Sequence, residues 1–261
     1  MAITTSFDPY TAEVIAPGQV CQPIDDFPDT FLVTFQGRTF DVLVDTYSPT
    51  HLVNLQIEET SAHNAASTVG QALAWTYQGH RLGAYLSPVG AAGAVAVMEK
   101  AIAYGASRFV VFGSCGVLVS HLPGDALILP TAAYRDEGTS YHYARSSDYM
   151  ALASHQQTAA ILRQLKVPYV TGRVWTTDAF YRETEGNLAK RVREGCIAVD
   201  METSALAALA EFRGVAVHQF LYQADALSGE AWDPGTLGHL PAEPRARYIQ
   251  IAAEIALRLG Q

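Results

Sequence analysis

The sequence predicts an α/β fold with a layered sheet, and three observations support this prediction. Short β-prone runs alternate with stretches whose apolar residues recur at helical spacing. The run RFVVFG (108–113) is short and apolar, as expected of a central strand that is covered on both faces. The chain has 261 residues, of which 49% are hydrophobic and 16% charged, so it can bury a large core.

β-Prone runs dominate the first part of the chain. TFLVTF (30–35) and RTFDVLVDTY (38–47) predict strands, because they are rich in β-branched and aromatic residues. Two more such runs flank Gln78-Gly79 and predict a hairpin over 72–90. The helical apolar pattern that follows at 92–104 stops at a glycine, the usual residue beyond a helix C-terminus.

Strands and helices alternate after the central strand, which is typical of an α/β sheet. In order we expect a strand at 125–130, a helix at 151–165, a strand at 169–175, a helix at 186–194, a strand at 197–199, a helix at 203–213, a strand at 215–225 and a helix at 245–259. The sequence contains no internal repeat or linker, so we expect a single domain over 1–261. Residues 1–29, rich in Pro, Asp and Gly, predict an irregular N-terminal arm.

Composition and motifs exclude several classes of function. The net charge of −9 argues against a nucleic-acid partner, since phosphates need a cationic face. A secretory signal and a membrane-spanning apolar stretch are both missing from the sequence, so we expect a cytoplasmic protein without a membrane partner. The three cysteines, Cys21, Cys115 and Cys196, form no C-x-x-C pair, and no H-E-x-x-H occurs, so we expect no metal. Glycine-rich dinucleotide and ATP motifs are also absent from the sequence.

Four predicted strands end in residues that suit a ligand site. These ends are Gly113-Ser114-Cys115-Gly116, the stretch WTTDAFY (175–181), Asp200-Met201-Glu202, and Asp225. If the strands are parallel, their ends meet at one edge of the sheet, where α/β proteins bind ligands. Together they offer an aromatic face for a base, an acid for vicinal hydroxyls and an acid for a leaving group. Each piece also has a structural explanation, since small residues allow tight turns and acids favour helix starts.

Four motifs together resemble the nucleoside phosphorylase family, which includes purine nucleoside phosphorylases, uridine phosphorylases and methylthioadenosine nucleosidases. They are YGASRFVVFGSCGVL (104–118), RDEGTSYHY (135–143), WTTDAFY (175–181) and VDMETSALAALA (199–210). The resemblance implies a three-layer phosphorylase/hydrolase-like α/β fold, with a central mixed β-sheet flanked by helices. It also implies cleavage of the N-glycosidic bond of a ribonucleoside in nucleoside salvage, without metal or organic cofactor. Inorganic phosphate would be the co-substrate, and the chain would form a homo-oligomer (a dimer, a trimer of dimers or a hexamer).

The resemblance assigns the sugar and the base to particular residues. Met201 and Glu202 fall on the ribose-binding pair, in which the carboxylate accepts hydrogen bonds from the sugar hydroxyls. Asp200 either contacts the ligand or supports the start of the helix. Phe180, followed by Tyr181, falls on the aromatic that stacks against the base.

The reacting groups are assigned in the same way. Asp225 falls on the catalytic acid of purine-cleaving relatives and, with Glu202, is expected to be catalytic. Ser114, with the backbone of Gly113 and Gly116 around Cys115, falls on the phosphate-contacting loop of the family.

The match breaks where phosphate should bind. Val111 replaces the arginine that phosphorolytic relatives carry three residues before the serine, and no G-D-P-x-R loop occurs in the sequence. Arg38, Arg81, Arg135 or an arginine of a neighbouring subunit could replace the missing cations. We therefore expect phosphorolysis first, hydrolysis as in the nucleosidases second, and non-catalytic nucleoside binding third.

The sequence says less about which base is bound and about which segment covers it. Asp225 favours a purine or purine-like base, whereas RDEGTSYHY (135–143) is more similar to the uridine phosphorylase branch of the family. The stretch LSGEAWDPG (227–235) offers Glu230, Trp232 and Asp233 for a lid, although a solvated loop is an equal interpretation.

Overall fold

A computed structural model describes residues 3–55, 69–120, 122–229 and 231–260 of the chain. The elements follow one another in this order: η1 (Ile3–Thr5), α1 (Pro17–Val20), β1 (Thr30–Thr34), α2 (Gly37–Tyr47), β2 (Thr50–Asn54), β3 (Gln71–Tyr77), β4 (His80–Leu86), α3 (Ala91–Tyr104), β5 (Arg108–Val117), β6 (Leu127–Asp136), α4 (Ser140–Tyr143), β7 (Tyr149–Ala151), α5 (His155–Gln164), β8 (Tyr169–Thr177), η2 (Phe180–Arg182), α6 (Glu185–Arg193), β9 (Cys196–Asp200), α7 (Thr203–Arg213), β10 (Ala216–Ala226) and α8 (Ala242–Leu259).

The strands form one mixed sheet in the order β10-β6-β8-β9-β5-β1-β4-β3-β2, with β7 paired to β6. β5 is parallel to β1 and β10, whereas β8 is parallel to β6 and β9. An additional pairing between β10 and β5 closes the strands from β10 to β5 into a ring. The predicted α/β fold with a central mixed sheet is therefore confirmed.

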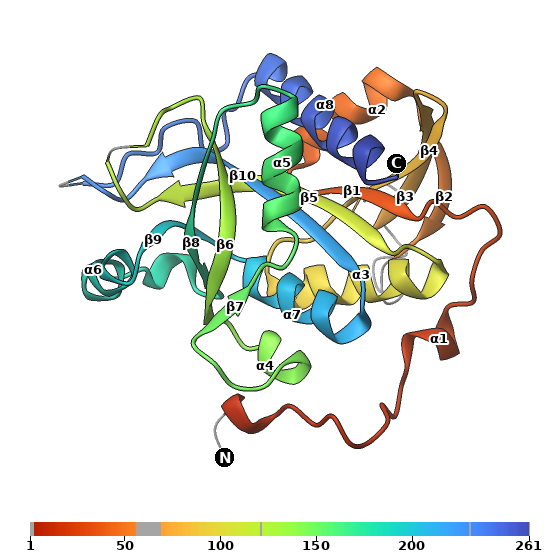
Figure 1. Cartoon of the computed structure of the whole chain (residues 1–261), viewed down its shortest axis with the longest axis horizontal. Helices are drawn as coiled ribbons and strands as arrows, with labels where there is room; N and C mark the ends of the chain where they lie inside the picture. The colour runs from red at the N-terminus through yellow and green to blue at the C-terminus, as the bar shows by residue number, and fades with distance from the viewer. Residues whose placement is uncertain (1–2, 56–68, 121, 230, 261) are drawn as a thin grey trace.

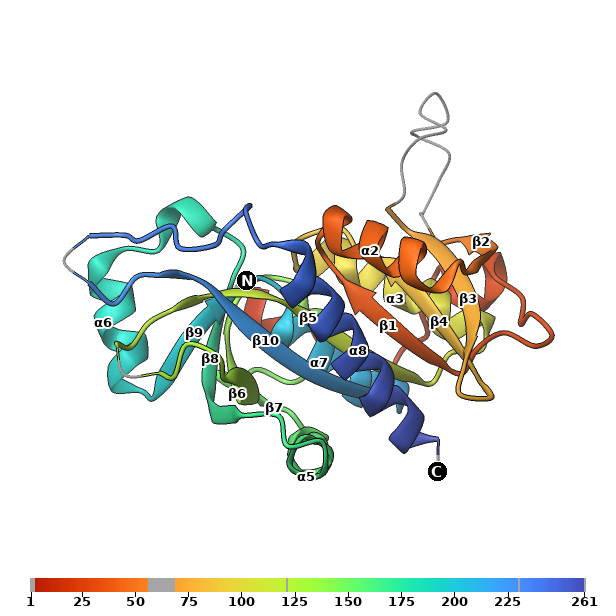
Figure 2. The ribbon, with the colours of Figure 1, turned by 90° about the horizontal axis from the view of Figure 1, so that it is seen from above.

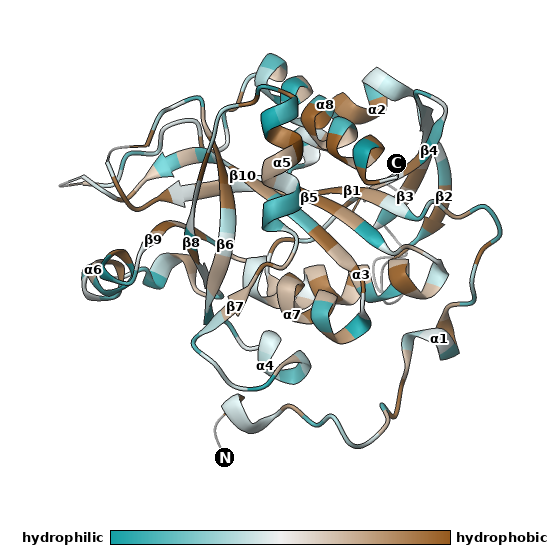
Figure 3. Cartoon of the chain, viewed as in Figure 1, coloured by the Kyte–Doolittle hydropathy of each residue, from teal (hydrophilic) through white to brown (hydrophobic). Residues whose placement is uncertain are grey.

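Helices cover both faces of the sheet (Figures 1 and 2). α2, α5 and α8 lie on one face, and α3 and α7 lie on the other. Because side chains alternate along a strand, β5 feeds both cores: Val110 and Phe112 pack under α8, and Phe109 and Val111 pack under α3 and α7. Figure 3 shows the hydrophobic colouring along the inner strands and these helices, whereas α6 is largely hydrophilic.

One predicted strand is wrong. Residues 38–47 form the helix α2, although their composition is β-prone. Phe40, Leu43 and Tyr47 recur at helical spacing, and Phe40 and Leu43 are buried against α8 and the sheet. Tertiary burial of this face outweighs the local preference for a strand. By contrast, the hairpin of β3 and β4 and the bounds of α7 agree with prediction.

The assumption of four parallel strands is also wrong in part. β9 runs antiparallel to β5, and the two strands overlap at their carboxyl ends through Gly116 opposite Val199. The strand predicted at 108–113 continues to Val117, so Gly113–Gly116 is extended backbone paired with β10 rather than a turn. The carboxyl ends of β5, β8, β9 and β10 still lie close together, because these strands belong to the same closed ring.

The N-terminal arm contains the short helices η1 and α1 and otherwise lacks regular structure. Glu13 pairs with Arg213 of α7 at 2.9 Å, and the Phe7 ring packs edge-on against Phe212. No helix in the described ranges is long and apolar enough to cross a membrane.

Candidate active site

A cavity of about 240 Å³ opens where β5, β9 and β10 meet. The lining residues are Phe35, Gln36, Val89, Ser114, Cys115, Gly116, Phe180, Glu183, Val199, Asp200, Met201, Glu202, Asp225 and Leu237. Eight of the residues assigned from the sequence are among them: Ser114, Cys115, Gly116, Phe180, Asp200, Met201, Glu202 and Asp225.

Gly116 allows the three strands to meet. A Cβ atom at this position would lie 2.6 Å from Leu227 Cδ1 and 3.0 Å from Val199 Cγ1. A side chain would therefore separate β5 from β9 and β10. The register of β10 shifts between Gln223 and Asp225, so that Asp225 lies opposite Gly116. Irregularities of this kind redirect side chains next to binding sites.

Glu202 stands at the junction of β9 and α7, with 6% of its surface exposed. Its Oε1 accepts a hydrogen bond from the Gly90 backbone N–H at 2.7 Å, which ties it to the loop before α3. Burial and the neighbouring Asp200 raise the pKa of Glu202 above its usual range. The site thus holds an acid whose ionised form needs hydrogen-bond donors, such as the hydroxyls of a sugar.

Asp200 supports the start of α7. Its Oδ2 accepts from the Thr203 N–H at 2.8 Å and also from the Thr203 hydroxyl, and its Oδ1 accepts from Thr176 Oγ1 at 2.7 Å. Burial raises the pKa of this carboxyl, and the Thr203 and Thr176 donors oppose the shift. Of the two roles considered for Asp200, these bonds favour the structural one.

Ser114 is held by Gln36, which also lines the cavity. Gln36 Nε2 lies 3.2 Å from Ser114 Oγ, and Gln36 Oε1 accepts from Arg245 Nη1 at 2.8 Å. Arg245, a buried residue of α8, was not anticipated from the sequence. Val111, three residues before Ser114 in the chain, is buried under α3 and α7. Gly113 does not line the cavity.

Cys115 is a buried thiol rather than a nucleophile. Its Sγ lies 3.5 Å from the Tyr222 carbonyl oxygen. Burial, together with the charges of Asp200 and Asp225, raises the pKa of the thiol well above its usual value. The reactive thiolate form is therefore disfavoured.

The segment after β8 forms the opposite wall. Phe180 is 37% exposed and lines the cavity, whereas Tyr181 is 93% exposed and is not among the lining residues. Glu183 also lines the cavity, although sequence reasoning missed it. Burial, with a contribution from Asp225, raises the pKa of Glu183 to about 7. Only its position three residues after Phe180 could have indicated it.

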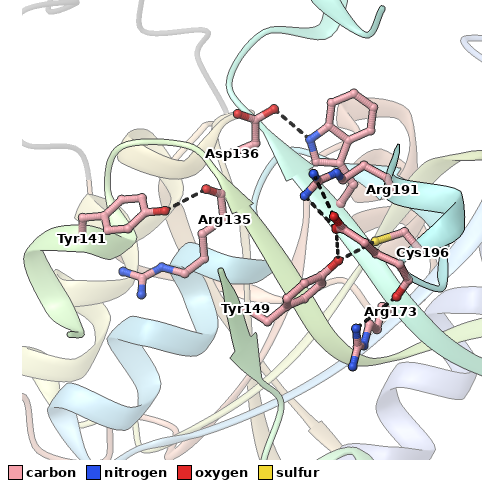
Figure 4. Close-up of polar contacts among 9 residues, drawn as sticks. Arg135, Asp136, Tyr141, Tyr149, Arg173, Arg191 and Cys196 are labelled. Atoms are coloured by element: carbon pink, nitrogen blue, oxygen red, sulfur yellow. Dashed lines mark hydrogen bonds and ion pairs between the residues drawn. The ribbon is translucent and has the colours of Figure 1, made fainter. Parts of the chain in front are cut away.

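Polar contacts anchor this segment at both ends (Figure 4). Before it, Trp175 Nε1 donates to Asp136 Oδ2 at 2.9 Å. Beyond α6, the Tyr149 hydroxyl donates to Glu194 Oε2 at 2.7 Å, and Arg191 pairs with Glu194 at 3.0 Å. These contacts fix the β8–η2–α6 segment on the sheet and so hold Phe180 and Glu183 in place.

Asp225 is bound by the segment predicted as a lid. The indole Nε1 of Trp232 donates to Asp225 Oδ2 at 2.8 Å, while 55% of the Trp232 surface is exposed. Backbone hydrogen bonds between Asp233 and Ala226 fold this segment back on β10. The Asp233 carboxylate accepts from the Gly235 N–H at 3.0 Å and does not line the cavity. Glu230 lies outside the described residues.

Arginine and lysine are absent from the described residues that line the cavity. Arg81 donates to the Asp26 carbonyl, and Arg135 is buried against Ser140 and the Arg145 carbonyl. Arg38 is exposed in the first turn of α2, two residues beyond Gln36. Among the residues with described positions, no group of three or more His, Cys, Asp or Glu is arranged to hold a metal ion.

Comparison with known proteins places the chain in a family. The model of the phosphorylase superfamily matches residues 49–258. A DeoD-type purine nucleoside phosphorylase of Aliivibrio fischeri is 25% identical over 188 residues, 70% of this chain and 74% of that protein. A guanosine phosphorylase of Halorubrum lacusprofundi is 24% identical over 143 residues, 54% of this chain and 59% of that protein.

Solved structures show the same fold. The AMP nucleosidase of Bacteroides thetaiotaomicron superposes with a TM-score of 0.68 at 19% identity, and the match covers 90% of each chain. The chain therefore belongs to the phosphorylase superfamily, the family of nucleoside phosphorylases and nucleosidases.

Proposed function

We propose that this protein cleaves the N-glycosidic bond of a neutral ribonucleoside, with water as the nucleophile. One observation carries the choice of water. The cavity is lined by the acidic residues Glu183, Asp200, Glu202 and Asp225, and its described lining contains no arginine or lysine. Phosphate is an anion that proteins bind best with bidentate guanidinium groups. The described lining offers phosphate no such group, whereas a water nucleophile needs none.

The same wall suits the sugar in its transition state. As the bond to the base breaks, positive charge develops on the anomeric carbon, and a nearby carboxylate stabilises that charge. Glu202 accepts hydrogen bonds from the ribose hydroxyls, and Met201 offers an apolar contact to the ring. Phe180 stacks on the base, and Asp225 lines the same cavity as Phe180.

Phosphorolysis is the second candidate. The names of the Aliivibrio and Halorubrum relatives favour it. It requires a cation from outside the described lining, either Arg38 after a change of rotamer or an arginine of a second subunit. The homo-oligomer expected from the sequence stays a prediction, which sedimentation of the pure protein tests.

A 5′-phosphate on the substrate meets the same difficulty as inorganic phosphate. The likeness to the AMP nucleosidase concerns the fold, and this cavity lacks a described cation for a nucleotide phosphate. We therefore assign neutral nucleosides, purine-containing ones first, as the substrate class.

The test is a nucleoside panel incubated with and without phosphate in ¹⁸O-labelled water, with the sugar product analysed by mass spectrometry. Labelled ribose, formed at a rate independent of phosphate, is the expected result. Ribose 1-phosphate, formed only with phosphate, would overturn hydrolysis and establish the second candidate. Binding of a nucleoside without turnover under either condition would overturn both and indicate a non-catalytic binder.

Glu202→Ala tests the assignment of the site itself. Loss of charge-assisted hydrogen bonds to the ribose, about 1.5–3 kcal/mol each, predicts a fall in kcat/KM of at least about 10-fold. Glu243→Gln, on the exposed first turn of α8, is the matched control.

A further inference from the structure

Two carboxylates, Glu183 and Asp225, line the cavity together with Phe180, and they lie close enough for the charge of Asp225 to act on Glu183. The family resemblance assigns proton donation to Asp225. We propose that Glu183 is the residue that donates the proton to the leaving base. The inference rests on the proposed function and names the acid of that same site.

The position of Glu183 suits a proton donor. It lies between η2, which begins at Phe180, and α6, and its carboxyl is half-buried in the cavity wall. Glu183 and the aromatic Phe180 line the same cavity, three residues apart in the chain. The anchoring of α6 through Arg191 and Glu194 keeps this acid against the cavity.

Hydrogen bonding distinguishes the two acids. Asp225 Oδ2 accepts from the Trp232 indole at 2.8 Å, and an indole N–H only donates. This bond holds Asp225 Oδ2 as an acceptor, so this oxygen is occupied, unlike the Glu183 oxygens within the described structure. In the part of the chain with described coordinates, no hydrogen bond from a side chain or backbone group reaches the Glu183 carboxyl, which is therefore free to bind the base.

Burial and the charge of Asp225 favour the protonated form of Glu183. Together they raise the pKa of this carboxyl to about 7, so its acid form is available near neutral pH. The other titratable groups that line the cavity are Asp200 of β9, Glu202 at the start of α7 and Cys115 of β5. Beside Glu183 in the chain, Arg182 and Glu185 are both exposed and carry opposite charges.

The step balances without a further reactant. The Glu183 proton moves to a ring nitrogen of the base as the electron pair of the C1′–N bond passes to the base. A water oxygen forms the new bond to C1′ and releases its proton to solvent. The Glu183 carboxylate then regains a proton from solvent through the open mouth of the cavity.

The test compares Glu183→Gln with Glu185→Gln, an exposed acid two residues away, on two substrates. Inosine needs a proton on its leaving base, whereas 4-nitrophenyl riboside releases a stable nitrophenolate without one. We expect Glu183→Gln to lower kcat on inosine about 100-fold or more, the usual contribution of a general acid, and to leave the nitrophenyl substrate within about threefold of wild type. Glu185→Gln should match wild type on both.

The pH profile gives an independent readout. In wild type, kcat on inosine should fall as pH rises through about 7, as Glu183 loses its proton. Glu183→Gln should remove this descending limb. Asp225→Asn should shift the limb to lower pH, because it removes the charge that raises the pKa of Glu183.

Equal losses on both substrates, or an unchanged limb in Glu183→Gln, would overturn the inference. A wild-type protein that cleaves neither substrate would instead contradict the proposed function. The two failures are therefore distinguishable.

Discussion

Gln36 connects the buried guanidinium of Arg245 to the hydroxyl of Ser114. Its Oε1 accepts from Arg245 Nη1 at 2.8 Å, and its Nε2 lies 3.2 Å from Ser114 Oγ. Arg245 also donates to Thr39 Oγ1 and to the Leu240 carbonyl. The Arg245 guanidinium is thus bound by neutral acceptors. Its link to the cavity runs through the Gln36 amide.

Substitutions of Gln36 should separate orientation from stability. Gln36→Glu keeps an acceptor for Arg245 but loses the donor to Ser114, so kcat should fall about 2- to 10-fold with little change in Tm, as for one neutral hydrogen bond. Gln36→Leu also leaves the guanidinium short of an acceptor and should lower the free energy of unfolding by about 1–3 kcal/mol. Steady-state kinetics and thermal melting measure both effects. A Gln36→Glu protein with wild-type kcat would show that Ser114 does not need a hydrogen bond donated by residue 36.

Removing the charge of Glu202 should stabilise the fold, and more so at high pH. The folded state raises the pKa of this carboxyl above its ordinary value of 4.5. The Glu202 carboxyl therefore contributes its full share to the free energy of unfolding below pH 4.5, and this contribution is lost as pH rises through the pKa of the folded state. Glu202→Gln does not ionise, so its advantage in Tm over wild type should grow from pH 5 to pH 9, by roughly 2–4 °C per kcal/mol. Calorimetry at three pH values tests this, and a constant difference would contradict it.

Trp232 should influence activity more than stability. Trp232→Phe removes the 2.8 Å hydrogen bond to Asp225 but changes a side chain that is 55% exposed. We expect kcat/KM to fall about 2- to 10-fold, with the free energy of unfolding within about 0.5 kcal/mol of wild type. Tyr10→Phe, at an arm residue that is 85% exposed, controls for loss of a surface polar group. A large loss of stability in Trp232→Phe, with unchanged kinetics, would argue against its link to Asp225.

The three thiols should be unreactive in the folded protein. Cys21, Cys115 and Cys196 are all buried, and burial raises the pKa of Cys115 and Cys196. A disulfide reagent at pH 8 should therefore label almost no thiol in the native protein and all three in guanidinium chloride. Rapid labelling of native Cys115, located by peptide mapping, would reopen the possibility of a thiol nucleophile.

The sequence by itself determined those parts of the fold whose local signals agree with burial. The hairpin of β3 and β4 follows from Gln78-Gly79 between two β-prone runs, and α7 follows from its apolar pattern and from Gly214 at its end. Met201 and Glu202 are predicted for the site because they follow a predicted strand and because their motif resembles the ribose-binding pair of the family. Such positions at strand ends are where α/β sheets bind ligands.

Only the tertiary structure decided the rest, because it depends on contacts between distant segments. α2 forms since Phe40 and Leu43 bury one helical face against α8, which composition alone does not reveal. The antiparallel approach of β9 to β5 needs the closed ring of strands. Glu183 becomes a candidate acid only because the fold brings it near Asp225, and the pKa of a carboxyl depends on how far its surroundings remove it from water.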